Sequence, residues 1–393
     1  MKKALLLLIL LISTVLSGCW SSKEIEDLSL NVGIAIDDGD QLAEEMRHID
    51  QVSSSQEKGD LAVTFQYINT SATTPDSKGG GQKQFTNVSA IGNTNHQNIR
   101  VISLREENPI MFHHTKVIVV SGELLKKIGI REIMDFYLRD SEARLSCLVL
   151  VSKGPAKDTL QSKDPAVIPS FRLLGIVDNA YRSSRILNPM TLAKIQGESY
   201  SKSSYLLQNV YTEDGEVKFS GAGIMRGKTN KLIGYISEDD LTGITLITGD
   251  AKGGPIPAFE KQSGKPMVYE IETIKSKIIP HVKRGKISFD IKIDSEGILS
   301  ENWKDSKEPS EKIASEAEEL IKEEMEKTLA RTLKKTQKHY KVDVVGFDNE
   351  LRIKYPKTWN RVKDDWDATF AELPIKYSIK VKIINYGNTD ARS

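Results

Sequence analysis

The first nineteen residues constrain this chain more than any other segment, because they decide where the rest of it has to fold. Two lysines open the chain, a mostly apolar run follows from residue 4 to residue 16, and Leu16-Ser17-Gly18-Cys19 ends the segment. This order is typical of a bacterial lipoprotein signal peptide, residues 1–18, cut before Cys19. The alternatives are an ordinary secretory signal with a chance cysteine and a short transmembrane anchor, but the apolar run is shorter than the ~20 residues that span a bilayer.

The two cysteines of the chain have different predicted fates. Cys19 would receive a diacylglyceryl group through a thioether, and two acyl chains anchor a protein stably where one is marginal. Its acylation leaves Cys147 without a partner, which excludes a disulfide framework. Cys147 lies in the apolar run 145–151, with no adjacent His or Lys to lower its pKa. We therefore predict that Cys147 is a buried, inert thiol in a strand.

The length of the chain limits the number of domains, and its net charge limits the kinds of partner. Removal of the first 18 of 393 residues leaves 375, more than one hydrophobic core usually supports, so we expect two or three domains. The same cut removes two of the 55 basic residues and none of the 54 acidic ones, so the mature chain is nearly neutral. A neutral chain without a basic cluster gives no electrostatic reason to bind nucleic acid.

Hydrophobic periodicity predicts a mixed α/β fold in three domains, each a mixed sheet flanked by helices. The predicted domains are 19–200, 201–280 and 281–393. In the first domain, a strand, helix and strand follow one another from residue 114 to 151, which favours a βαβ unit with parallel strands. The other elements expected there are a short helix from residue 20, hairpin strands at 30–37 and 61–68, polar loops at 41–60 and 70–84, and helices at 155–160 and 166–181.

The second and third predicted domains are simpler. The middle one should contain a hairpin of strands 217–225 and 231–236, a short helix 237–241 and a strand 245–248. In the last one, a long amphipathic helix spans 311–339 between strands 286–294 and 376–384. The helix has one apolar stripe, so we expect it to pack on its own sheet rather than on a partner. We expect Trp359, Trp366 and Phe370 to close the same core.

The sequence predicts no catalytic residue, no metal site and no cofactor. His113 and His114 are adjacent before a strand, so their rings would point to opposite faces and could not chelate one ion. The glycines Gly221 and Gly223 superficially resemble a dinucleotide loop, but a second strand follows them where that loop needs a helix. Acidic pairs such as Asp37-Asp38 and Asp239-Asp240 stand at turns and helix starts, where we expect ordinary solvated side chains. The chain is therefore not expected to be an enzyme.

Three ordered stretches of the chain carry a family resemblance. The stretches are Cys19–Leu28 leading into 32–37, then 221–225 with 232–236, and finally 340–347 followed by 356–359, Trp366 and the last strand. They resemble the Ger(x)C family of spore germination lipoproteins, the C subunits of nutrient germinant receptors, and together span almost the whole mature chain in the family's order. The polar segment 41–60 and the Gly-rich loop 70–84 depart from the usual pattern.

This resemblance implies a non-enzymatic subunit that is held by its lipid on the outer face of the spore's inner membrane. It implies assembly with two integral membrane subunits, A and B, into a receptor for small nutrients, and a fold of three α/β domains. The nutrient is generally attributed to the membrane subunits, so only Cys19 carries over as a functional position. The alternative is a lipid-anchored solute-binding protein of a transporter, which should show two similar lobes. An envelope hydrolase would need a nucleophile or paired carboxylates that the sequence does not offer.

Overall fold

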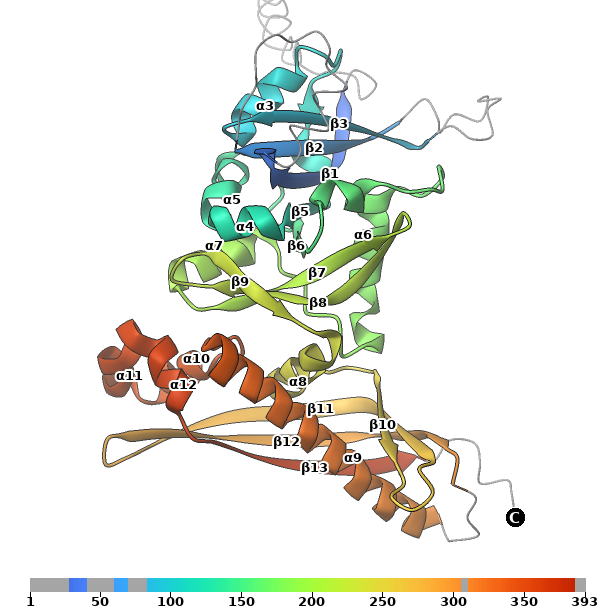
Figure 1. The fold of residues 1–393 in the computed structure, drawn as a ribbon, viewed down its shortest axis with the longest axis vertical. Coiled ribbons are helices and arrows are strands. Elements are labelled where there is room, and N and C mark those ends of the chain that lie inside the picture. Colours follow the sequence, from blue (N-terminus) through green and yellow to red (C-terminus); the bar gives the residue numbers. More distant parts are fainter. Residues whose placement is uncertain (1–27, 41–59, 70–82, 305–309, 386–393) are drawn as a thin grey trace, which may run out of the picture.

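The structure, a computed structural model, has two β-sheets stacked along the long axis of the molecule (Figure 1). It describes residues 28–40, 60–69, 83–304 and 310–385. Outside these ranges lie the signal peptide with Cys19, the helix expected from residue 20 and most of the two predicted polar loops.

The upper sheet is mixed and has the strand order β3-β2-β1-β5-β6-β7-β8-β9, with β4 paired to β1. β1, β5, β6 and β7 run parallel, whereas β2, β3, β8 and β9 join antiparallel to their neighbours. The predicted β1–β2 hairpin, the β5–β6 parallel pair and the β8–β9 hairpin are confirmed. The strands are β1 (Ser29–Asp38), β2 (Leu61–Ile68), β3 (Phe85–Gly92), β4 (Ile110–Met111), β5 (Val117–Ser121), β6 (Leu148–Ser152), β7 (Tyr205–Glu213), β8 (Glu216–Arg226) and β9 (Lys231–Ile236).

Helices cover both faces of this sheet, as a parallel core requires. α4 (Gly122–Lys127), α5 (Ile130–Arg139) and α7 (Leu192–Ser201) bury apolar side chains in one core, together with Cys147. On the other face η4 (Ala156–Leu160) and α6 (Pro169–Val177), which continues into η5 (Asp178–Arg182), form a second core. The predicted burial of Cys147 is confirmed, since it is 3% exposed and burial raises the pKa of its thiol. It lies directly before β6, however, and not in a strand as predicted. The single helix predicted after β5 is two helices, because Ile128 adopts an extended conformation between them.

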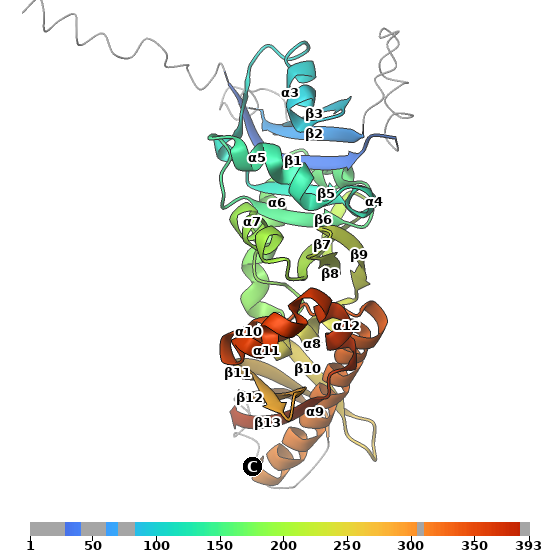
Figure 2. The ribbon, with the colours of Figure 1, turned by 90° about the vertical axis from the view of Figure 1, so that its left-hand side faces the viewer.

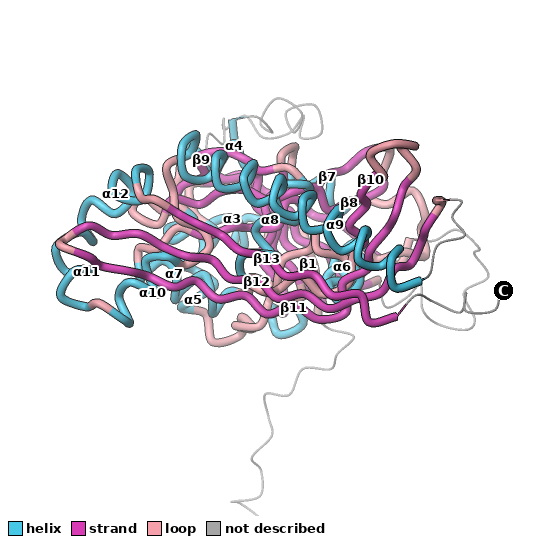
Figure 3. Tube along the Cα trace, turned by 90° about the horizontal axis from the view of Figure 1, so that it is seen from below, coloured by secondary structure: helices cyan, strands magenta, loops and turns pink. Residues whose placement is uncertain are grey.

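The lower sheet has the strand order β10-β11-β12-β13, and β13 runs parallel to β12. Its strands are β10 (Pro255–Phe259), β11 (Pro266–Lys283), β12 (Lys286–Asn302) and β13 (Ile375–Asn385). The long helix α9 (Ser310–Leu333) runs obliquely to them (Figure 3) and continues as a π-helical turn, η6 (Lys334–Tyr340). Its apolar stripe, with Ala317, Ile321, Met325 and Leu329 fully buried, belongs to the core of this sheet, as predicted.

Short helices fill the level between the two sheets (Figure 2). Trp366 and Phe370 are buried against them and Trp359 is partly buried, which confirms their predicted place in the core. These helices are α8 (Glu238–Thr248), α10 (Phe347–Lys354), α11 (Pro356–Val362), η7 (Lys363–Asp365) and α12 (Trp366–Glu372).

The structure differs from the prediction for the middle segment, 201–280. It has no sheet of its own among the described residues: β7–β9 extend the upper sheet, through β6–β7 pairs such as Val151 with Asn209, and β10 and β11 belong to the lower sheet. Periodicity shows which residues form a strand, but not which edge the strand joins. The strand predicted at 245–248 is the last turn of α8. The three-domain division itself stays a prediction.

The acidic pair at the end of β1 is buried, which corrects the expectation of ordinary solvated side chains. Asp37 is 1% exposed, and its carboxylate accepts hydrogen bonds from the backbone N–H groups of Ala156 (2.6 Å) and Lys157 (2.9 Å). Asp38 is also buried and pairs with Lys127. Burial raises the pKa of Asp37 to about 6, although both backbone hydrogen bonds oppose the shift. Asp37 therefore joins the end of β1 to η4.

This pKa predicts how stability depends on pH. Because the pKa of Asp37 is higher in the folded protein than the ~3.9 of an unfolded chain, the folded state binds more protons between these values, and stability falls as pH rises. The free-energy advantage of the wild type over Asp37→Asn should shrink by roughly 2–3 kcal/mol from pH 4 to pH 7. Urea unfolding of both proteins across this range measures the difference, and parallel pH profiles would contradict the assignment.

Candidate functional site

Cys19, the one functional position predicted from the sequence, lies outside the described residues. The structure does describe the histidine pair and the glycines that the sequence analysis considered. His113 and His114 end the short 3-10 helix η3 (Phe112–His114), where His113 is 51% exposed in its side chain and 4.0 Å from Glu142. Within the ranges described, no group of three or more His, Cys, Asp or Glu side chains could hold a metal ion. Gly221 and Gly223 lie in β8 of the predicted hairpin, so the dinucleotide-loop interpretation is excluded.

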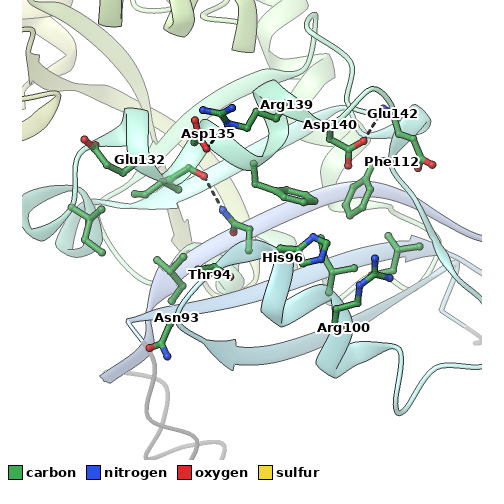
Figure 4. Close-up of a pocket in the computed structure, with 17 residues that line it drawn as sticks. Asn93, Thr94, His96, Arg100, Phe112, Glu132, Asp135, Arg139, Asp140 and Glu142 are labelled. Carbon is green, nitrogen blue, oxygen red and sulfur yellow. Dashed lines mark hydrogen bonds and ion pairs between the residues drawn. The ribbon is translucent and has the colours of Figure 1, made fainter.

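A pocket of about 730 Å³ opens between α5 and the helix α3 (Asn95–Ile102), and we name it the α3–α5 groove (Figure 4). Apolar side chains from both helices, β2, β4 and η3 form its floor, and charged side chains form its rim. The floor includes Leu61, Ile99, Ile110, Phe112, Ile133 and Phe136; the rim includes His96, Arg100, Glu132, Asp135, Arg139, Asp140 and Glu142.

One buried amide and several contacts between aromatic rings fix the two sides of the groove relative to each other. Asn95 donates from Nδ2 to the carbonyl of Ile133 (2.8 Å) and accepts from the hydroxyl of Tyr137 (3.4 Å), which ties the start of α3 to α5. The ring of Phe136 lies 5.7 Å from that of His96 and 6.3 Å from that of Phe112. These edge and tilted contacts fix both walls, since aromatic pairs of this geometry stabilise a core.

Sequence reasoning missed α3, and with it the groove. The signal was present: Thr94 caps the helix by accepting from the N–H of Gln97 (3.1 Å), and the side chain of Gln97 accepts from the N–H of Asn93 (2.9 Å). A threonine followed three residues later by glutamine is the spacing of a capping box. The helix has eight residues, and its short polar sequence does not display a strong apolar stripe.

The rim of the groove is acidic overall. Four carboxylates and two guanidinium groups line it, a net charge of −2 with His96 neutral. Asp135 and Arg139 pair with each other at 2.8 Å, and this hydrogen bond lowers the pKa of Asp135. Arg100 and Glu132 form no ion pair within the described part of the chain. The arrangement offers an apolar floor between charged walls, which suits binding rather than bond chemistry.

A second cavity, of about 830 Å³, lies where the upper sheet meets α10 and α11. One polar contact joins the two halves of the molecule: the hydroxyl of Ser203, just before β7, donates to Asp348 of α10 (2.7 Å). Nearby Asp343 accepts from the indole N–H of Trp366 (3.1 Å), a contact among the helices of the lower half. Burial, and after it the neighbouring carboxylate of Asp348, raise the pKa of Asp343 above its ordinary value. Tyr340 adds a bond to the carbonyl of Tyr235 (2.8 Å). These groups serve the junction of the two sheets.

Two family models together match nearly all of the chain. The model described as "Spore germination protein N-terminal domain" matches residues 21–210, and "Spore germination B3/ GerAC like, C-terminal" matches residues 220–387. No helix in the described ranges combines the length and the apolar character that crossing a membrane requires.

Relatives from Bacillus subtilis (strain 168) match over the same extent. The chain is 42% identical to "Spore germination protein YndF" over 388 residues, 97% of this chain and 96% of the relative. It is 30% identical to "Spore germination protein B3", with 95% of each chain covered. Among solved structures, the "Crystal Structure of the GerBC protein" matches with a TM-score of 0.61 and 27% identity, covering 83% of this chain and 94% of that one.

Proposed function

The chain belongs to the B3/GerAC-like family of spore germination proteins, and on that premise we propose that it is a lipid-anchored, non-catalytic subunit of a nutrient germinant receptor. The membership confirms the resemblance to the Ger(x)C proteins that the sequence suggested. In this proposal the protein is held on the outer face of the spore's inner membrane by a diacylglyceryl group on Cys19. There it assembles with two integral membrane subunits, A and B, to trigger germination.

One observation carries the proposal: a leader typical of a lipoprotein signal peptide, residues 1–18 directly before Cys19, opens a chain that aligns with a spore germination protein over 97% of its length. The non-catalytic role is supported by the likeness to spore germination proteins, whose family the sequence resembled as receptor C subunits. No residue of this chain is assigned to the nutrient.

The solute-binding alternative gains no support from the fold. A two-lobed binding protein would place similar lobes on either side of a hinge. Counted over the described residues, the upper sheet has nine strands around a parallel centre, and the lower sheet has four strands with one parallel pair. The two halves therefore differ in size and in topology.

Replacement of Cys19 by alanine tests the proposal. Cys19→Ala should block lipidation and signal processing, because the thioether needs the sulfur, and the protein should be lost from the spore inner membrane. Tagged wild-type protein should co-purify two polytopic membrane proteins from solubilised spore membranes, and the variant should recover markedly less of both. Unchanged membrane retention of the variant would refute the anchor, and recovery of a permease with an ATPase would favour the transporter alternative.

A further inference from the structure

The α3–α5 groove is left open by the described part of the chain, and we propose that it is the docking site for a partner polypeptide segment with an apolar face and at least one basic side chain. The inference rests on the proposed function, because the partner would be one of the two integral membrane subunits.

The floor of the groove favours apolar side chains over a small polar ligand. Sites for small polar molecules fix them with a few convergent polar groups in the pocket. Among the described residues that line the groove, Asn95 is the only buried polar side chain, and both ends of its amide are already bonded within the fold. What remains at the floor is apolar, with Ile99, Ile110 and Phe136 only partly buried. Covering these side chains with a partner would remove apolar surface from water.

The charges of the rim favour a basic occupant. Glu132, Asp140 and Glu142 stand along the α5 side of the groove, and His96 and Arg100 stand on the α3 side (Figure 4). Because Asp135 is already paired with Arg139, the three other carboxylates of the α5 side outnumber the one guanidinium opposite. A partner segment that places a lysine or arginine near α5 would pair with these carboxylates, whereas an acidic segment would be repelled by them. Such charge complementarity sets partner choice and orientation.

The position of the groove brings it near the proposed anchor. Ile110, in its floor, lies in β4, which pairs with the start of β1 through Ser29, and the N–H of Ser29 donates to the carbonyl of Pro109 (3.1 Å). Cys19 is ten residues before Ser29, and ten residues span at most about 35 Å. The groove is therefore tethered close to the membrane surface, where segments of an integral membrane protein can reach it.

Charge reversal at the rim tests the proposal in the full-length, lipidated protein. Glu132 and Glu142 are exposed, so Glu132→Lys with Glu142→Lys should leave the fold intact but repel a basic segment. We expect co-purification of the two polytopic proteins from spore membranes to fall about tenfold. The matched control is Glu213→Lys with Glu216→Lys, the same charge change at the exposed β7–β8 turn, which should co-purify them like the wild type.

Site-specific crosslinking supplies the second measurement. A photoreactive phenylalanine in place of Ile99 should form an adduct with one of the two co-purified membrane proteins, and the same group in place of Glu213 should not. Equal co-purification by both double variants, or the lack of such an adduct from position 99, would overturn the docking proposal while the receptor-subunit function stands. Failure of the wild type to recover any polytopic protein would instead overturn the proposed function.

Discussion

Gly221→Val should lower the free energy of unfolding by about 3–5 kcal/mol, one of the largest effects of any single substitution in the described chain. Gly221 lies in β8 with φ of +68°, in the left-handed region that side chains with a branched Cβ avoid. A Cβ there would lie 2.0 Å from the carbonyl oxygen of Ile236 and 3.1 Å from the carbonyl carbon of Ser237. Both are backbone atoms, so no rotamer change relieves the clash, and β9 would have to move away from β8.

The effect can be measured by urea unfolding of the purified protein followed by circular dichroism. Gly175→Ala is the matched control, because Gly175 lies inside α6 and a methyl group added there would meet no neighbouring side chain within 4 Å. Alanine is favoured over glycine in a helix, so this variant should be unchanged or more stable by up to about 1 kcal/mol. A loss in Gly221→Val no larger than about 1 kcal/mol would refute the geometric argument.

Asp240→Ala should cost about 3 kcal/mol, because it removes the link between α8 and α9. Asp240 is 2% exposed, which corrects the expectation of a solvated side chain, and it forms a capping box with Ser237, whose hydroxyl donates to it at 2.7 Å. It also accepts from Lys335 (2.6 Å) and Arg331 (3.3 Å) at the end of the α9 helix. The variant loses the cap of α8. It also leaves Lys335 and Arg331 without their carboxylate partner at the buried start of that helix.

The control for this substitution is Asp239→Ala, at the neighbouring position of the same helix. The side chain of Asp239 is 63% exposed, as the sequence predicted for both members of the pair. The loss of its ion pair with Arg185 should cost less than about 1 kcal/mol, because exposed ion pairs contribute little. Urea unfolding of the two variants compares them directly, and equal losses would contradict the role given to Asp240.

The pH dependence of Asp240→Ala provides a second readout. Burial alone would raise the pKa of Asp240, but the hydrogen bonds from Lys335 and Ser237 outweigh burial and hold the pKa below its ordinary value. A carboxylate with a lowered pKa stabilises the fold above the unfolded pKa of ~3.9 and loses this contribution as pH falls through the folded pKa. The unfolding free energies of wild type and variant should therefore converge below about pH 4. If the difference in unfolding free energy stayed constant below about pH 4, the charge of Asp240 would not be its cause.

The close contact of α8 and α9 explains why one predicted strand is helical. Three of the four residues Thr245–Thr248 are β-branched, which favours a strand by local propensity. However, Ser237 caps a helix ahead of it, and Gly243 lets α9 approach so closely that a Cβ there would lie 2.1 Å from the hydroxyl oxygen of Thr332. Packing against α9 therefore overrides the local preference for a strand. The residues of α9 that make this contact lie almost ninety residues further along the chain.

The sequence by itself determined what depends on neighbouring residues: the parallel β5–β6 unit, the β8–β9 hairpin, the amphipathic α9, the buried thiol of Cys147 and the family. Only the tertiary structure decided that β7–β9 complete the upper sheet, that Asp37 and Asp240 are buried, and that α3 and α5 enclose a groove. Each of these depends on pairing or packing between distant segments. Periodicity records which face of an element is apolar, but the partner that covers that face is fixed only when the chain is folded.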